Sequence, residues 1–307
     1  MGLTHDRHSL SITVVAMTLI VGVHPQNPSL SILARRPEHV AALRAQGIAF
    51  FVYGAGAATI PLMRLGVIQL AGTGATPPIL AKAGGLDVAV FGMSGPRHER
   101  GGLVVRADSP YRTLADLRGR GVALMPISWH TQFLAAELDN AGVAWRDVNA
   151  VELLPATARD AFYQGLLDAI VATDPLLAEI ESAVKVRILA RPGSAFSNRS
   201  VYWGRQDVLR DHPKAVQALV DALSDSDALT AADPEGAAQL LAGLNGHNAA
   251  GWLAALTARP WGVHLPDAGF LAEQQHHADI FARFALIPEQ IAVDDTVTHR
   301  YPAAVAA

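Results

Sequence analysis

Short apolar runs alternate with amphipathic segments along most of the chain. MTLIVGV at 17–23, LDVAVFGM at 86–93 and LDAIVAT at 167–173 are typical of buried strands, because each is apolar and bounded by turn residues. Between such runs, segments like WHTQFLAAELDNAG at 129–142 repeat their apolar residues at helical spacing and end at a glycine. Alternating strands and helices predict an α/β fold with mainly parallel sheets.

The same pattern predicts the remaining elements. The sequence contains no internal repeat and no low-complexity segment. Pro37 suits the first turn of a helix and Gly47 the position just after its end. Further strands are expected at 48–53, 67–71, 102–106, 122–125, 149–154, 186–191 and 200–205, and helices at 37–46, 59–65, 79–84, 113–119, 157–165, 175–184, 213–230, 234–244, 248–257 and 267–283.

The middle third of the chain reads as a small βαβ unit between earlier α/β elements and a later helical stretch. The chain must therefore cross between two lobes near 101–105 and again near 200–204. We predict lobe I from residues 1–103 and 203–307, and lobe II from residues 104–202. Two crossings imply a hinge and a cleft, and ligands of open α/β sheets bind at the carboxyl ends of the strands.

Three strand-to-helix corners carry capping residues beside a predicted helix start. Thr76, Ser128 and Asp174 each stand beside such a start, and Thr73 and Gly74 belong to the first corner. Ordinary helix capping explains any one of them. Free N–H groups and the helix dipole also suit converging corners to an anion, so both interpretations stay open.

Composition narrows the function classes. The 307 residues are 50% hydrophobic and 17% charged, and much of the apolar content is alanine, which indicates a compact soluble protein rather than a membrane protein. A net charge of -4 without a Lys/Arg cluster argues against nucleic-acid binding. The absence of cysteine excludes disulfides, thiolate metal sites and cysteine nucleophiles.

The N-terminal stretch has two interpretations. Arg7 precedes an apolar run, as in an export signal, but no small-x-small cleavage site follows. The run is shorter than the roughly 18 apolar residues that a membrane span needs. The part at 17–23 is better interpreted as the first buried strand, and an export signal is neither indicated nor excluded.

Four segments carry a family resemblance. They are GTGATPPILAKAGG at 72–85, RADSPYRTLADLRGRGVAL at 106–124, LPATARDAFYQGLLDAIVATDPLLA at 154–178 and FSNRSVYWGR at 196–205. Together they resemble the alkanesulfonate- and taurine-type solute-binding proteins of ABC importers. The order and spacing fit along nearly the whole chain, including the closing segment at 257–288.

The resemblance implies a two-lobed periplasmic-binding-protein type II fold that closes like a venus flytrap on a small organosulfonate, either an aliphatic sulfonate or a taurine-like compound. It also implies a monomer with no cofactor, an ABC permease in the membrane as partner, and a periplasmic or other extracytoplasmic location. A chain that is complete as given would instead be cytoplasmic.

The resemblance further implies which residues meet the ligand. A sulfonate is a permanent anion with three acceptor oxygens, so hydroxyl and N–H donors can hold it without a formal counter-charge. The expected ligand-binding residues are His24, Gln26, Thr73, Gly74, Thr76, Ser128, Trp129, His130, Thr131, Asp174, Asn198 and Tyr202.

Three positions depart from the family pattern. Ala75 replaces an acidic residue, Thr173 an aromatic one and Trp129 a small one. Trp129 either stacks on the organic part of the ligand or packs against its own helix neighbours. Asp174 either caps its helix or pairs with an ammonium group of a taurine-like ligand.

Two other chemistries compete with simple binding. EQQHHAD at 273–279 offers metal-ligating residue types without a metalloenzyme signature, so a solvated helix face is expected there and no metal. Enzymes that resemble this family depend on cysteine, which this chain lacks. An enzyme acting on a sulfonate, a sulfinate or a similar small anion would need other groups, such as His130 with Asp174.

Overall fold

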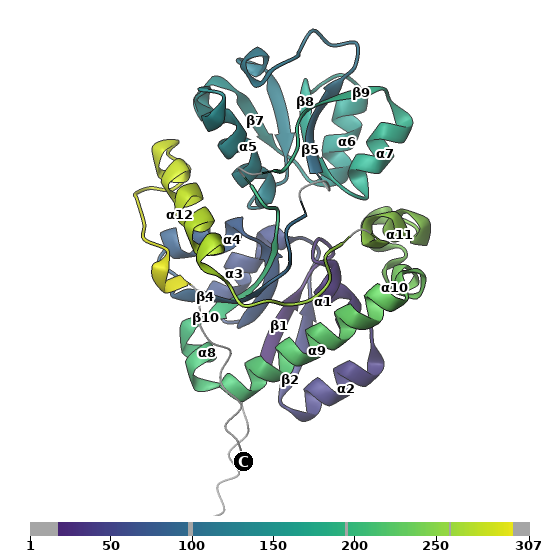
Figure 1. Ribbon diagram of the computed structural model, residues 1–307, viewed down its shortest axis with the longest axis vertical. Coiled ribbons are helices and arrows are strands. Elements are labelled where there is room, and N and C mark those ends of the chain that lie inside the picture. Colours follow the sequence, from purple (N-terminus) through teal and green to yellow (C-terminus); the bar gives the residue numbers. More distant parts are fainter. Residues whose placement is uncertain (1–17, 98–100, 194–195, 258, 297–307) are drawn as a thin grey trace, which may run out of the picture.

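The computed structural model of the protein describes residues 18–97, 101–193, 196–257 and 259–296. Two five-stranded sheets form its framework, and Figure 1 shows one sheet with its helices in each of two lobes. The predicted two-lobed α/β fold is therefore confirmed. The N-terminal stretch that resembles an export signal lies outside the described residues.

The sheet of lobe I has the strand order β2-β1-β3-β10-β4, and the sheet of lobe II has the order β7-β6-β8-β5-β9. The strands are β1 (Leu19–Val23), β2 (Ile48–Val52), β3 (Leu70–Gly74), β4 (Val88–Met93), β5 (Gly101–Arg106), β6 (Gly121–Leu124), β7 (Asn149–Glu152), β8 (Ala169–Thr173), β9 (Val186–Ala190) and β10 (Ser200–Arg205).

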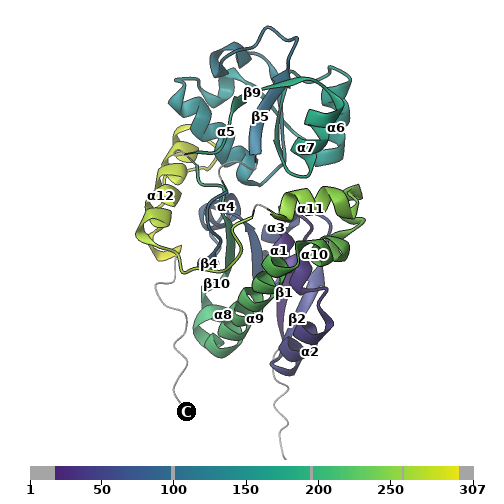
Figure 2. The same cartoon turned by 45° about the vertical axis from the view of Figure 1, so that its right-hand side comes forward.

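Helices cover the faces of both sheets (Figures 1 and 2). The α-helices are α1 (Pro28–Leu33), α2 (Pro37–Ala45), α3 (Thr59–Arg64), α4 (Thr76–Ala83), α5 (Trp129–Asn140), α6 (Pro155–Tyr163), α7 (Leu176–Ala183), α8 (Gln206–Asp211), α9 (Pro213–Ala232), α10 (Pro234–Leu241), α11 (Ala249–Thr257) and α12 (Ala268–Arg283). The 3₁₀ helices are η1 (Gly56–Ala58), η2 (Leu114–Leu117), η3 (Trp145–Asp147), η4 (Leu244–Gly246) and η5 (Asp294–Thr296).

Both sheets follow the same plan, with one antiparallel strand in each. In lobe I, β10 pairs antiparallel with β3 and β4, and in lobe II, β5 pairs antiparallel with β8 and β9. These two are the first strands after the chain has changed lobes. The predicted lobe boundaries, after residues 103 and 202, would fall inside β5 and β10. We therefore propose that the lobes divide between β4 and β5 and between β9 and β10.

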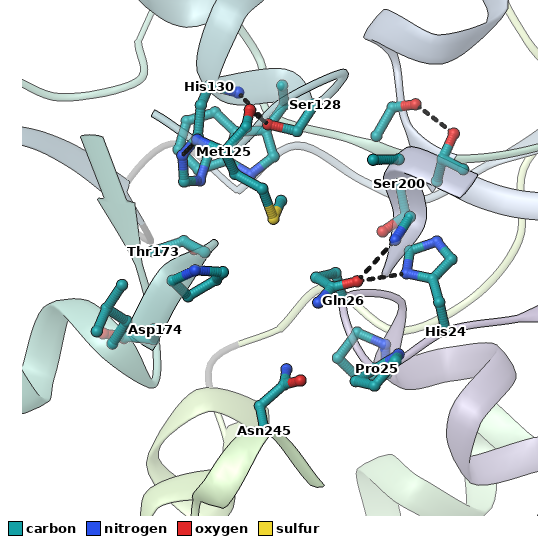
Figure 3. A pocket seen from close by; sticks show the side chains of 18 of the residues that line it. His24, Pro25, Gln26, Met125, Ser128, His130, Thr173, Asp174, Ser200 and Asn245 are labelled. Carbon is teal, nitrogen blue, oxygen red and sulfur yellow. Dashed lines mark hydrogen bonds between the residues drawn. The ribbon is translucent and has the colours of Figure 1, made fainter. Parts of the chain in front are cut away.

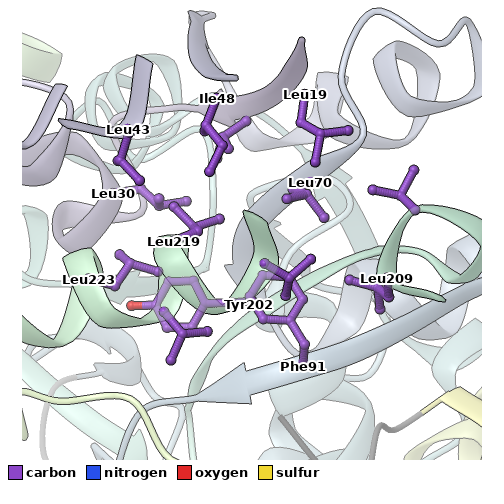
Figure 4. Close-up of a cluster of buried hydrophobic side chains, with 14 of the residues drawn as sticks. Leu19, Leu30, Leu43, Ile48, Leu70, Phe91, Tyr202, Leu209, Leu219 and Leu223 are labelled. Atoms are coloured by element: carbon purple, nitrogen blue, oxygen red, sulfur yellow. The ribbon is translucent and has the colours of Figure 1, made fainter. Parts of the chain in front are cut away.

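The lobe I core lies between the sheet and the helices α1 and α9 (Figure 4). Leu19 and Leu70 of the sheet pack with Leu219 and Leu223 of α9 and with the ring of Tyr202. All are at most 1% exposed, and each buried leucine contributes about 1.5–3 kcal/mol relative to an exposed one. The core thus fixes the strand ends that carry the site.

Helix α12 packs on both lobes (Figures 1 and 2). Phe281 on α12 lies in one buried cluster with Ile79 of α4 and Ala135 of α5. Arg283 at the end of α12 forms an ion pair with Asp139 of α5, with 2.6 Å between Nη2 and Oδ1. The C-terminal part of the chain therefore joins the lobes along one side.

The region around the first corner differs from the prediction. Strand β3 runs to Gly74, so Thr73 lies in the strand and not in a turn. Helix α4 begins at Thr76 with Ala75 as its N-cap, and Thr76 is therefore not a cap. Helices α1 and α8 were not predicted from the sequence, although Asn27 caps α1 by accepting the Leu30 N–H.

Candidate functional site

A cavity opens between the two lobes, with about 970 Å³ of empty space when the solvent at its mouth is included. Lobe I contributes the loop after β1, the end of β3 and Arg97. Lobe II contributes the start of α5 and the corner between β8 and α7, and residues around α11 form a further wall (Figure 3). Met125 and Asn245 lie on opposite sides of the space in Figure 3.

The structure brings most of the predicted site residues together. Those that line the cavity are His24, Gln26, Thr73, Gly74, Ser128, Trp129, His130 and Asp174. Thr76, Thr131, Asn198 and Tyr202 do not line it. Segments distant in the sequence thus converge on one space, while contact of each residue with a ligand stays a prediction.

The two threonines at helix starts face the protein interior. Thr76 donates its hydroxyl to Gln132 Oε1 at 2.9 Å, which links α4 of lobe I to α5 of lobe II. Thr131 is 8% exposed in the first turn of α5, and its hydroxyl has no hydrogen-bond partner among the described residues. Neither threonine lines the cavity, and contact of their hydroxyls with a ligand stays a prediction.

Strand β10 and the loop before it keep Asn198 and Tyr202 away from the cavity. Tyr202 lies in the lobe I core, because alternate residues of a strand face opposite sides of its sheet (Figure 4). The Asn198 carbonyl oxygen accepts from Arg97 Nε at 3.0 Å. Asn198 therefore holds the cavity residue Arg97 and is not itself a wall residue.

The amino end of α5 faces the cavity and is capped as predicted. The Ser128 hydroxyl oxygen accepts from the His130 N–H at 3.2 Å and donates to the Met125 carbonyl oxygen at 2.7 Å. The cap fixes the first turn of a twelve-residue helix, whose dipole favours negative charge at this end. Ser128 is thus engaged twice with the backbone.

His130 lies in the cavity wall at this end of α5. Its Nδ1 accepts from the Met125 N–H at 3.2 Å, so the proton of the neutral ring lies on Nε2. Nε2 is buried and has no hydrogen-bond partner among the residues that the structure describes. Burial lowers the pKa of His130 to about 3, so the ring is neutral at physiological pH. His130 is therefore a fixed hydrogen-bond donor.

His24 and Gln26 form a second polar group, on the lobe I wall. His24 Nε2 lies 2.9 Å from the Gly72 carbonyl oxygen, and its Nδ1 lies 2.9 Å from Gln26 Oε1. The same Gln26 oxygen accepts from the Gly56 N–H at 3.0 Å. Burial lowers the pKa of His24 to about 4, although both contacts act in the opposite direction. The His24 ring is thus held by the Gly72 backbone and by the Gln26 side chain, which Gly56 holds in turn.

Trp129 belongs mainly to the protein interior. It is 7% exposed, and its ring stacks on Phe196 at a centroid distance of 5.6 Å and meets Phe133 at 5.7 Å. It also forms part of the cavity wall. Packing in the lobe II core therefore accounts for most of its surface, and only a small part faces the cavity.

Asp174 stands one residue before Pro175, the N-cap of α7, and is therefore not the N-cap that the sequence predicted. Its Oδ1 accepts from the Ala178 N–H in the first turn of α7 at 3.1 Å. The residue also lines the cavity. One carboxylate oxygen is therefore turned to the first turn of α7, although Asp174 is not its N-cap.

Sequence reasoning missed two arginines on the cavity wall, Arg97 and Arg259. Burial is the main cause that lowers the pKa of Arg97, and the nearby Arg259 charge adds to it. The cavity wall therefore carries two charged groups beside the predicted uncharged donors. No local motif surrounds either arginine, and only the fold brings the loop after β4 next to the loop after α11.

A buried carboxylate lies close to this pair. Asp227 of α9 accepts from the Ser29 hydroxyl and from the Gly262 N–H, the latter at 3.1 Å. Burial raises the pKa of Asp227, and the charge of Arg259 partly opposes that shift. Asp227 thus joins α1, α9 and the loop after α11 behind the cavity.

Residues around α11 reach toward lobe II. His247 Nδ1 lies 3.8 Å from Glu179 Oε2 on α7, and its ring meets Trp252 edge-on at 6.0 Å. Burial lowers the pKa of His247, and the charge of Glu179 acts against this shift. The two lobes therefore touch at this side of the cavity as well as along α12.

The acidic and histidine-rich segment of α12 serves packing in this structure. Glu273 Oε1 accepts from the Ser197 hydroxyl at 2.9 Å, and His277 is buried against Phe196 with ring centroids 5.7 Å apart. Among the described residues, no group of three or more His, Cys, Asp or Glu side chains is placed to hold a metal ion.

A family model and a curated protein both match the sequence of this chain. The family model described as "NMT1/THI5 like" matches residues 45–237. A curated protein of Escherichia coli (strain K12), named as an aliphatic sulfonates-binding protein, is 31% identical over 245 residues, which are 80% of this chain and 77% of that protein.

Two solved structures of sulfonate-binding proteins have the same fold over nearly the whole chain. The periplasmic aliphatic sulphonate binding protein SsuA from Escherichia coli has a TM-score of 0.81 at 28% identity, covering 92% of both chains. The alkanesulfonate-binding protein SsuA from Xanthomonas axonopodis pv. citri, bound to MOPS, has a TM-score of 0.80 at 27% identity, covering 92% of this chain and 98% of that one.

An enzyme shares the fold at lower similarity. The desulfurization enzyme DSZB has a TM-score of 0.64 at 17% identity, covering 93% of this chain and 97% of the enzyme. This likeness concerns the fold alone, because folds of this kind carry both binding and catalysis.

Proposed function

The chain belongs to the NMT1/THI5-like family of solute-binding proteins with the periplasmic-binding-protein type II fold, and from this premise we propose that it captures an aliphatic sulfonate for an ABC importer. The predicted resemblance to alkanesulfonate-type binding proteins is confirmed. The choice of an aliphatic sulfonate as ligand is the proposal, and it is supported by the chemistry of the cavity.

The observation that carries the proposal is the set of donors on opposite cavity walls. His130 offers a buried Nε2–H beside the amino end of α5 in lobe II, and Arg97 and Arg259 lie on the walls that the rest of the chain provides. A sulfonate has three acceptor oxygens and one negative charge that persists at any physiological pH. Such an anion matches N–H donors and guanidinium groups, which donate and do not accept.

The remaining wall suits a short organic chain. Met125, Pro77 and Trp252 line the cavity between the polar groups. Apolar walls with a few convergent donors are typical of small-molecule sites. An alkyl group on the sulfonate gains by leaving water here, at about 0.8 kcal/mol for each buried CH₂. We therefore expect an alkanesulfonate to bind more tightly than inorganic sulfate.

Catalysis is not part of the proposal, because the cavity histidines are poor bases. His130 uses its Nδ1 to accept from a backbone N–H, and its pKa is about 3. The Ser128 hydroxyl donates to a backbone carbonyl oxygen and points its proton away from any base. A nucleophile activated by a neighbouring base requires the opposite arrangement.

The family also suggests a partner and a location. We propose a monomer that works outside the cytoplasm and passes its ligand to an ABC permease, and the location is supported by the similar SsuA protein, which is named as periplasmic. Within the described part of the chain, no helix has both the length and the apolar character that a membrane crossing requires.

A ligand screen tests the proposal. Purified protein is mixed with butanesulfonate, hexanesulfonate, MOPS, taurine, sulfate and the matched carboxylates, and its thermal unfolding is followed. A sulfonate present at one hundred times its dissociation constant should stabilise the folded state by about 2.7 kcal/mol. Chromatography of the mixture then shows whether a bound sulfonate is recovered unchanged. Equal stabilisation by carboxylates, or conversion of the sulfonate, would contradict the proposal.

A further inference from the structure

His24 lies between two hydrogen-bond acceptors. Its Nε2 faces the Gly72 carbonyl oxygen and its Nδ1 faces Gln26 Oε1, both at 2.9 Å. The orientation of the Gln26 amide follows from Gly56, whose backbone N–H can only donate and lies 3.0 Å from the same oxygen. In Figure 3, two dashed lines meet at the Gln26 oxygen, and one of them comes from the His24 ring. Neither ring nitrogen of His24 therefore faces a donor.

A neutral imidazole cannot satisfy this arrangement. One of its nitrogens donates and the other accepts, so either tautomer places a lone pair against an oxygen. Only the imidazolium form, with N–H on both nitrogens, satisfies both contacts. The ring is 3% exposed, however, and burial lowers the pKa of His24 to about 4. In the absence of a nearby anion, the ring is neutral at pH 7 and one of its contacts is unfavourable.

The surrounding residues hold the ring in this position. A Cβ atom at Gly56 would lie 2.9 Å from Cε1 of His24, which shows how closely the η1 backbone covers the ring. The Tyr53 ring packs on another side at a centroid distance of 5.5 Å. The Ser31 hydroxyl donates to the His24 carbonyl oxygen at 3.0 Å and anchors the loop. Rotation of the ring is therefore a costly way to relieve the unfavourable contact.

The titratable neighbours do not provide the missing negative charge. Burial raises the pKa of Tyr53, at the end of β2, to about 12, so this phenol is neutral. His130 across the cavity is neutral, and the wall residues Arg97 and Arg259 are cations. Asp174 lies in lobe II with one oxygen turned to α7. The causes that shift the pKa of His24 are burial and its two hydrogen-bond partners.

We propose that His24 takes up a proton when an anion enters the cavity, so that anion binding is coupled to protonation of this side chain. The inference rests on the proposed function, because it needs an anionic ligand. The entering charge stabilises the imidazolium, which then donates to both the Gly72 oxygen and the Gln26 oxygen. Binding thus removes an unfavourable contact that the empty site contains.

The sign of the pH dependence follows from this coupling. The anion raises the pKa of His24 in the complex above its value of about 4 in the free protein. Affinity therefore increases as the pH falls from above the pKa of the complex toward that of the free protein. Between these limits one proton is taken up, and the association constant rises by at most about tenfold for each pH unit. Above both values the affinity does not depend on pH.

Calorimetry with butanesulfonate tests the coupling, because this ligand does not titrate between pH 5 and 8. Titrations of the full chain are run in bis-Tris, imidazole and Tris, whose ionisation enthalpies differ and which contain no sulfonate. Proton uptake appears as a binding enthalpy that depends on the buffer. In parallel, the ¹⁵N shifts of the histidine rings report directly which ring gains a proton. Wild type should take up a proton and bind more tightly at low pH.

Three variants separate His24 from the other histidines. His24→Gln should bind without proton uptake and with an affinity independent of pH. Gln26→Glu places a carboxylate against Nδ1, so His24 should be protonated before the ligand binds and uptake should disappear. His39→Gln is the matched control, because His39 pairs with Asp225 on the outer surface, and it should behave as wild type.

The outcomes distinguish the two levels of the proposal. Butanesulfonate binding without proton uptake in wild type would overturn the coupling and leave the proposed function standing. Uptake that persists in a folded His24→Gln protein would also overturn it. A failure of every sulfonate to bind would overturn the proposed function and the coupling together. If His24→Gln does not fold, the ring shifts of wild type decide the question alone.

Discussion

Replacing His130 by alanine should weaken sulfonate binding by about 10- to 150-fold. The side chain offers a neutral N–H whose direction is fixed, because Nδ1 already accepts from the Met125 N–H at 3.2 Å. A hydrogen bond to a charged partner contributes about 1.5–3 kcal/mol. Each 1.4 kcal/mol corresponds to about a tenfold change in the dissociation constant.

The same substitution should also destabilise the fold, so binding and stability must be measured separately. Without the ring, the Met125 N–H loses its acceptor, which costs at most about 1–3 kcal/mol because this donor is only partly buried. Urea unfolding of His130→Ala gives this cost. Calorimetry with butanesulfonate, at a temperature where the variant is fully folded, gives the loss of affinity. His39→Ala serves as the control for removal of a histidine outside the cavity.

The affinity loss should be independent of pH between 5 and 8. Burial keeps the pKa of His130 at about 3, so the ring is neutral throughout this range. A folded His130→Ala protein that binds butanesulfonate within twofold of wild type would refute the assignment of Nε2–H as a ligand donor. A loss that appears only below pH 6 would refute the neutral-donor reasoning, since it would require a charged ring.

Three further predictions follow from the cavity and its supports. Trp129→Ala should lower the free energy of unfolding by about 3–5 kcal/mol in a denaturant titration, because the ring is packed in the lobe II core. Arg259→Met should weaken sulfonate binding and reduce its salt dependence, whereas Arg210→Met should change neither, because Arg210 pairs with Asp211 on the outer surface. Without ligand, the free energy of unfolding should fall as the pH drops from about 6.5 toward 4, because His24 and His130 are buried in the neutral form and protonate more readily when unfolded. The corresponding glutamine variants should lose part of this slope in unfolding curves recorded at several pH values.

Local signals predicted the elements well because strand and helix patterns are short-range properties. Ser128 was identified as a helix cap from its place before an amphipathic segment, and the structure confirms it. Gly47 and Gly142 were placed just after helix ends, where both adopt positive φ. The end of β3 was misplaced because Thr73 and Gly74 are typical of turns, whereas pairing with β10 keeps them in the sheet.

The site was predicted less completely because it depends on contacts between distant segments. Whether Thr76 faces a ligand or the interior is decided by Gln132, which lies in the other lobe. The orientation of Tyr202 is set by the face of β10 that α9 covers, and strand periodicity alone does not say which face that is. Arg97 and Arg259 lie in unremarkable loops that only the tertiary fold places at one cavity.

The attachment of α12 to both lobes determines where the molecule can open. The cluster around Phe281 and the pair of Arg283 with Asp139 tie the lobes along one edge, whereas the opposite edge depends on the longer contact between His247 and Glu179. The lobes should therefore separate by a hinge motion, with the hinge at the edge that α12 joins. A solute would enter past α7 and α11, and spectroscopic labels on those two helices should report the motion with the largest amplitude.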